Sequence, residues 1–62
     1  MERDYDIFEK FPDGSFVWRG VISGHENAIR KLRELSAQTH NELHLMHVPT
    51  NSIIAILKPP PV

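Results

Sequence analysis

The sequence contains no cysteine. This absence excludes disulfides, thiolate zinc sites, iron–sulfur clusters and a cysteine nucleophile, and it fits a reducing compartment. A domain of 62 residues has a small core and often needs a disulfide, a metal or self-association for support. Because disulfides are excluded, self-association is the support that the composition leaves most open.

The chain also lacks a surplus of charge and any long apolar run. Seven basic and eight acidic residues give a formal net charge of −1, whereas nucleic-acid-binding proteins usually carry a large basic excess. No apolar run approaches the roughly 20 residues that span a bilayer, and the charged residues 1–6 lack the apolar core of a signal peptide. We therefore expect a cytoplasmic protein with no membrane partner, and nucleic acid only as an alternative partner.

Four segments have the composition of β-strands and one has the periodicity of a helix. Branched and aromatic residues dominate the strand segments, and apolar residues recur at spacings of three and four between about residues 24 and 39. The predicted strands are Tyr5–Phe11, Phe16–Ile22, Leu43–Val48 and Ser52–Leu57. This ββαββ order predicts a single α+β domain over residues 1–58, followed by a proline-rich tail over residues 59–62.

Two hairpins joined by a crossover helix predict a four-stranded antiparallel sheet with the helix packed on one face. The third strand would run parallel to the second and therefore antiparallel to the first, which gives the spatial order 2-1-3-4 with a right-handed crossover. A three-stranded version, with the fourth strand swapped onto a neighbouring subunit, is the alternative. One helix covers only one side of such a sheet, so the other side is left to water or to a partner.

The predicted helix has signals at both ends. Ser23 followed by Glu26 has the spacing of a capping box, in which each side chain bonds a free backbone N–H of the other residue. Asn41 can adopt the left-handed conformation that closes a helix, so we expect the helix to end near residues 39–41.

The helix-free face is the predicted contact surface. Pairing Phe11 with Phe16 sorts the first hairpin onto two faces, because alternate strand residues point oppositely. The more apolar face, which includes Trp18, is assigned to the core. The other face, or an edge strand of the sheet, is expected to pair with a second copy of the chain as a homodimer. In the second hairpin, the same alternation places Ala55 and Leu57 on this helix-free face and Ile56 on the core side. The predicted contact residues of the helix-free face are Phe8, Val17, Arg19 (at the rim), Val21, Met46, Val48 and Ile53.

Glu9 is the one charged residue on the expected core face of the first hairpin. A buried carboxylate there would have a raised pKa and could act as a general acid; at the sheet rim, its head would instead lie in water. The sequence shows no nucleophile–base pair, no phosphate-binding glycine loop and no carboxylate set for a metal. We therefore expect no enzymatic activity and no cofactor.

Three histidines, His40, His44 and His47, have spacings that occur in metal sites. On a strand, however, residues 44 and 47 point to opposite faces because their offset is odd. His40 is expected in the preceding turn. One ion could collect all three only with a second chain or a bulge.

A small nucleic-acid-binding regulator is the alternative function. It would use Arg19 together with the helix cluster Arg30, Lys31 and Arg33 to contact phosphates. Glutamates at positions 26 and 34 lie one turn either side of Arg30, and such a mixture is typical of a solvated helix face.

Several positions along the chain also carry a resemblance. They are Tyr5-x-Ile7-Phe8, Asp13-Gly14, Trp18, Ala28, Leu35 and Asn41-Glu42. With these positions, residues 5–55 resemble a group of short, mostly uncharacterised bacterial proteins of ββαβ or ββαββ plan. The resemblance implies a small bacterial α+β domain, and it brings no activity, cofactor or catalytic residue.

Overall fold

The computed structural model describes residues 4–59 of the chain. Its elements follow the predicted ββαββ order, with a short 3₁₀ turn between the last two strands. Of the predicted proline-rich tail, residues 60–62 lie outside the described residues. The elements are β1 (Asp4–Lys10), β2 (Phe16–Ser23), α1 (His25–Ser36), β3 (Glu42–His47), η1 (Val48–Thr50) and β4 (Ser52–Leu57).

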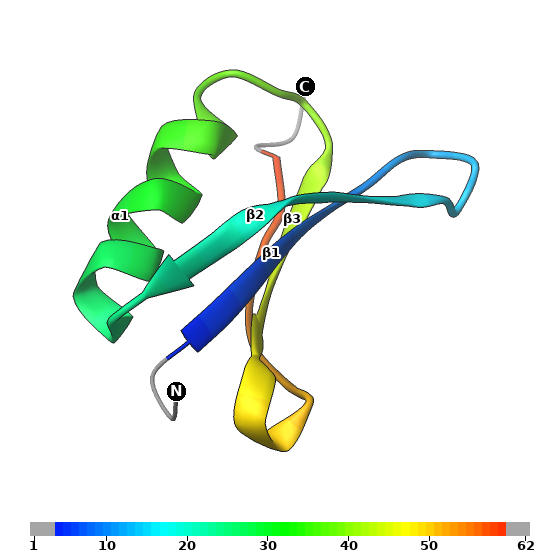
Figure 1. Cartoon of the computed structure of the whole chain (residues 1–62). Helices are drawn as coiled ribbons and strands as arrows, with labels where there is room; N and C mark the ends of the chain where they lie inside the picture. Colours follow the sequence, from blue (N-terminus) through cyan, green and yellow to red (C-terminus); the bar gives the residue numbers. More distant parts are fainter. Residues whose placement is uncertain (1–3, 60–62) are drawn as a thin grey trace.

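The four strands form one antiparallel sheet in the order β2-β1-β3-β4. Helix α1 lies across one side of this sheet (Figure 1). The predicted α+β fold and strand order are therefore confirmed. β1 and β3 are interior strands, β2 and β4 are edge strands, and no other described element covers the side opposite α1. We call that side the open face.

The core lies between α1 and the helix-facing side of the sheet. Ala28, Leu32 and Leu35 recur at spacings of four and three, so they share one face of the helix, and all three are buried. The interior strands supply the matching layer, because their alternate residues point toward the helix. That layer consists of Tyr5, Ile7, Leu43 and Leu45, with Ile22, Ile29, Ala55 and Leu57 packed against the core.

The helix is shorter than predicted, and the capping-box prediction was wrong. Its N-cap is Gly24, with a φ of 91° and no side-chain cap hydrogen bond. Ser23 is instead the last residue of β2, where it pairs with Asp4. At the other end the helix stops at Ser36, so Asn41 does not close it.

A bulge in β2 changes which side chains face the core. Ile7 pairs with Gly20, but the next residue of β1 pairs with Trp18, so Arg19 is the extra residue. The predicted pairing holds for residues 20–23 of β2. For residues 16–18, on the turn side of the bulge, the one-residue shift exchanges the two faces of the strand. Trp18 therefore lies on the open face, not in the core. Gly20 has a φ of 135°, a conformation that side chains disfavour, which accounts for a glycine inside this strand.

The turn of the second hairpin is one residue longer than predicted. β3 ends at His47, and Val48 begins the 3₁₀ turn η1, so the prediction of Val48 as a strand residue was wrong. Asn51 closes the turn in the left-handed conformation, with a φ of 53°. Asparagine tolerates this conformation better than most residues.

A second register shift alters the faces of β4. The pairing with β3 shifts between Leu45 and Met46, which leaves Ile54 as the extra residue. Ile56, predicted on the core side, therefore lies on the open face opposite His44. Ala55 and Leu57 were predicted on the open face. They lie instead on the helix side, opposite Leu45 and Leu43.

Candidate functional site

The open face carries most of the exposed large apolar side chains among residues 4–59, five of the seven. Phe8 and Met46 lie between them, partly buried. Their common side follows from the strand register, because residues directly opposite each other point to the same face. The open face consists of Phe8, Phe16, Trp18, Val21, Met46, Ile53 and Ile56, together with the polar residues Asp4, Asp6, Lys10, Ser23, Glu42 and His44.

Two cross-strand rows organise this surface. From β2 to β4 they run Trp18, Phe8, His44, Ile56 and Val21, Asp6, Met46, Ile53. Each row has apolar side chains on both edge strands and one ionisable side chain on an interior strand. The two ionisable side chains, Asp6 and His44, each have a partner on the same face.

Asp6 accepts a hydrogen bond from a tryptophan of the neighbouring row. The indole Nε1 of Trp18 donates to Asp6 Oδ1 at 3.1 Å. This bond holds the indole over β1 and supplies the polar partner that a tryptophan N–H requires. Trp18 is therefore ordered on the open face even though its side chain is 58% exposed.

His44 and Glu42 form the second polar contact of the open face. His44 Nε2 lies 3.0 Å from Glu42 Oε1, and the hydrogen bond from this histidine is the main cause of the lowered pKa of the Glu42 carboxyl. Lys10 and Lys58 add positive charge nearby. Phe16 packs edge-on against the His44 ring, with 5.2 Å between ring centroids. The polar part of the surface therefore carries both acidic and basic groups.

The predicted contact residues fall into two groups. Phe8, Val21, Met46 and Ile53 lie on the open face. Three others do not: Val17 pairs with Glu9 and so lies on the helix side, Val48 is in η1, and Arg19 turns to Glu9.

The prediction missed three residues of this surface, Phe16, Trp18 and Ile56. Each bulge shifts the pairing by one residue, which exchanges the faces of residues 16–18 in β2 and of residues 55–57 in β4. Gly20, a glycine inside a strand pattern, is a sequence signal for the first bulge. β4 contains no comparable signal.

Glu9 is the buried centre of a polar cluster on the helix side, which we call the Glu9 cluster. Its Oε2 accepts hydrogen bonds from Thr39 Oγ1 at 2.5 Å and from Asn41 Nδ2 at 2.8 Å. Its Oε1 accepts one from the Arg19 guanidinium at 2.9 Å. The cluster therefore joins β1, the bulge of β2 and the α1–β3 loop.

The structure contradicts both the rim position and the raised pKa that were considered for Glu9. Glu9 is only 3% exposed, so it does not lie at the rim with its head in water. Its pKa is lowered, first by the hydrogen bond from Thr39, then by that from Asn41, with the Arg19 charge adding to them against the opposing effect of burial. The carboxylate is therefore charged, and a general acid with a raised pKa is not present at this position.

The three clustered histidines are separated in the structure. His44 lies on the open face opposite Phe8, whereas His47 lies on the helix side opposite Tyr5. His40 is exposed in the loop before β3. Across residues 4–59, no group of three or more His, Asp or Glu side chains is placed to hold a metal ion.

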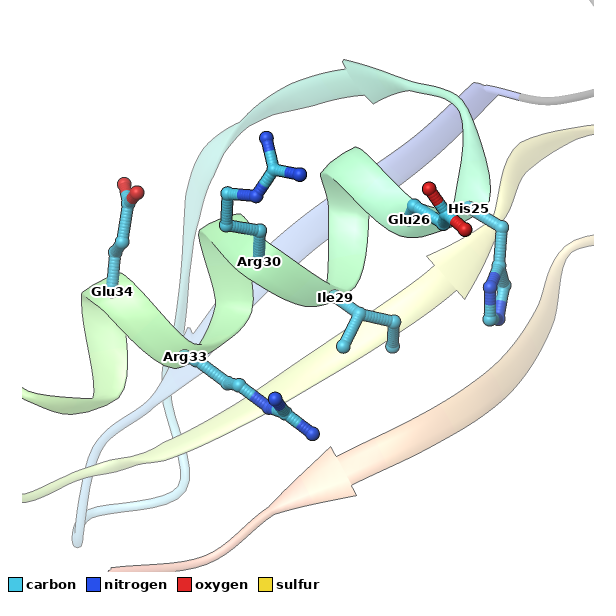
Figure 2. Close-up of a pocket in the computed structure, with 6 residues that line it drawn as sticks. All are labelled: His25, Glu26, Ile29, Arg30, Arg33 and Glu34. Atoms are coloured by element: carbon cyan, nitrogen blue, oxygen red, sulfur yellow. The ribbon is translucent and has the colours of Figure 1, made fainter.

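A shallow trough of about 600 Å³ runs along α1 (Figure 2). Ile29 and Arg33 project to one side of the helix, whereas Arg30 and Glu34 project to the other (Figure 2). All six lining residues come from this one helix, so the trough has no opposing wall. Among residues 4–59, Arg30 forms no ion pair with Glu26 or Glu34. The ion pair that is present on the helix joins Lys31 Nζ and Glu34 Oε1 at 4.0 Å.

No protein-family model matches the chain, and no curated protein or solved structure matches it. Within the described residues, no helix combines the length and the apolar character needed to cross a membrane. Function must therefore be argued from the surfaces of the domain itself.

Proposed function

We propose that this chain is a non-enzymatic interaction module of the cytoplasm that pairs with a second copy of itself through the open face. The observation that carries the proposal is the exposure of large apolar side chains there. Phe16, Trp18 and Val21 are each more than half exposed, and Ile53 and Ile56 are each 49% exposed. The cysteine-free composition supports a reducing compartment.

The apolar part of this surface is large enough for the centre of an interface. Aromatic side chains bury about 150–250 Å² each, so Phe16 and Trp18, each about half exposed, present on the order of 200 Å². Val21, Ile53 and Ile56 add to this area on the same face. Apolar patches of about 300–600 Å² are often functional.

The charge pattern favours a second copy over a polyanion. Asp6 and Glu42 lie on the same face as Lys10, and Lys58 is close enough to Glu42 to affect its pKa. A surface with both signs can match itself across a twofold axis, where the same patch meets in reverse orientation. A nucleic acid would instead bring its phosphates against three carboxylates, those of Asp4, Asp6 and Glu42.

Nucleic-acid binding remains the second candidate, because the bulge places Trp18 beside Phe8 and Phe16 on one face, and aromatic side chains on a sheet can stack bases. Two features argue against it. Arg19 is held by Glu9. The cluster Arg30, Lys31 and Arg33 belongs to α1, which lies on the side of the sheet opposite the open face (Figure 1).

Two valines of β2 provide a matched test. Val21 lies on the open face and Val17 on the helix side, and their exposed fractions are similar, 53% and 44%. A lysine at position 21 would place a charge inside the proposed interface, beside Asp6. At micromolar concentration we expect light scattering to give Val21→Lys half the mass of the parent protein, whereas Val17→Lys keeps the parent mass.

Three outcomes would contradict the proposal. The parent protein could be monomeric, or both variants could keep its mass, or both could lose it. The nucleic-acid reading would replace it if a single-stranded oligonucleotide quenched Trp18 fluorescence at low salt and the quenching weakened steeply as salt was raised.

A further inference from the structure

The exposed apolar side chains of the domain are confined to the two edge strands. Every exposed large apolar residue described lies on β2 or β4. A free strand edge presents unpaired backbone groups, and proteins usually protect it with charged residues or proline. The two edges can therefore be compared for such protection.

β4 lacks charged residues and proline along its whole length. Its six residues, Ser52–Leu57, are one serine followed by five apolar residues. β2, in contrast, has Arg19 at its bulge and Gly20 beside it. Helix α1 packs mainly on β1, β2 and β3, so it does not shield β4 (Figure 2). Ile53, Ile54 and Ile56 are accordingly 45–49% exposed.

We propose that the β4 edges of two copies pair antiparallel about a twofold axis, which extends the sheet to eight strands. The occupant of the edge is then a second copy, as in the proposed function, but the surface is different. An identical strand carries the same bulge at the same position, so its local twist matches. It also brings no charge against β4, because none is present between positions 52 and 57.

The faces of β4 determine the register of this pairing. Ile53 and Ile56 both lie on the open face, and residues opposite each other in an antiparallel pair point to the same side. The register that keeps both on the open face puts Ile53 of one copy opposite Ile56 of the other. In this register Lys58 lies opposite Asn51, so the two lysines are at opposite ends of the pair.

The edge interface and the face-to-face interface together predict a closed tetramer, in which the two twofold axes cross at right angles. The parent protein should then have four times the chain mass of 7.2 kDa. Ile54 is the bulge residue and belongs to neither cross-strand row, so Ile54→Lys tests the edge. We expect Ile54→Lys to halve the mass and Ile54→Val to leave it unchanged, both measured by light scattering.

Cysteine crosslinking tests the register independently of oligomer mass. Because the chain has no cysteine, single variants Ile53→Cys and Ile56→Cys can be mixed, both in the Val21→Lys background that removes face-to-face pairing. Under mild oxidation, the mixture should form a crosslinked dimer. Each variant alone should form little, since like positions lie three residues apart along the pair, beyond the roughly 7 Å limit for a disulfide.

The edge proposal is overturned if the mixture forms no more crosslink than the single variants, or if Ile54→Lys keeps the parent mass. Crosslinking in the mixture together with an unchanged mass of Val21→Lys would support the edge and contradict the face. The two proposals therefore fail separately.

Discussion

Replacing Glu9 by glutamine removes the buried charge while it keeps the shape of the side chain. The amide oxygen of Glu9→Gln can still accept from Thr39 and Asn41, but its NH₂ group meets the guanidinium of Arg19. A hydrogen bond to a charged group contributes about 1.5–3 kcal/mol. Because Arg19 is 39% exposed, it can turn to water, so we expect a loss of about 2 kcal/mol near pH 7.

That loss is large for a domain of this size, whose core rarely supplies more than about 3–5 kcal/mol. The matched control is Arg19→Gln, which leaves Glu9 with its two other donors. It should lower the free energy of unfolding by no more than about 1 kcal/mol, because the partner removed is partly solvated.

The effect of Glu9→Gln should depend on pH. The folded-state pKa of Glu9 lies below the ordinary glutamate value of 4.5. A lowered pKa means that the carboxylate contributes stability above the unfolded-state pKa and loses it as pH falls through the folded-state value. The difference between the parent protein and Glu9→Gln should therefore shrink from about pH 5 to about pH 3.

Urea unfolding followed by the fluorescence of the single tryptophan measures these differences. All variants are compared at one protein concentration, because association raises apparent stability. A difference below about 0.5 kcal/mol near pH 7, or one that stays constant down to about pH 3, would refute the stabilising role assigned to the charged Glu9.

Two further substitutions test the special backbone positions, each by the midpoint of urea unfolding. Gly20→Ala should destabilise the domain by about 1–3 kcal/mol through backbone strain alone, because the added Cβ would meet no atom within 4 Å; an unchanged midpoint would argue against the bulge. Asn51→Val should destabilise it by about 1–2 kcal/mol, whereas Asn51→Gly should stay within about 0.5 kcal/mol, because only glycine and asparagine suit the left-handed turn; equal effects of the two would contradict that geometry.

The topology could be predicted because it depends on features spread over whole segments. The spacing of Ala28, Ile29, Leu32 and Leu35 identifies the core-facing side of the helix from the sequence alone. All but Ile29 are buried, and Ile29 is partly buried against the core. The strand order follows from strand directions, which a single error in register does not alter. Both predictions therefore tolerate mistakes at individual residues.

The composition of the open face depends on single residues and could be predicted only in part. An extra residue at position 19 exchanges Val17 and Trp18 between the faces, and the extra residue at position 54 does the same to Ile56. A bulge forms where two strands fit each other better with one residue displaced, so its position depends on the partner strand. The burial of Glu9 likewise depends on donors some 30 residues away in the chain.

The interior place of β1 has a consequence for folding at high concentration. β1 needs neighbours on both sides, and its partner β3 begins only at Glu42. A chain that has formed only its first hairpin and helix leaves the second side of β1 available for hydrogen bonding. The second hairpin of another molecule can insert there, so refolding at high protein concentration favours exchange of whole hairpins between molecules.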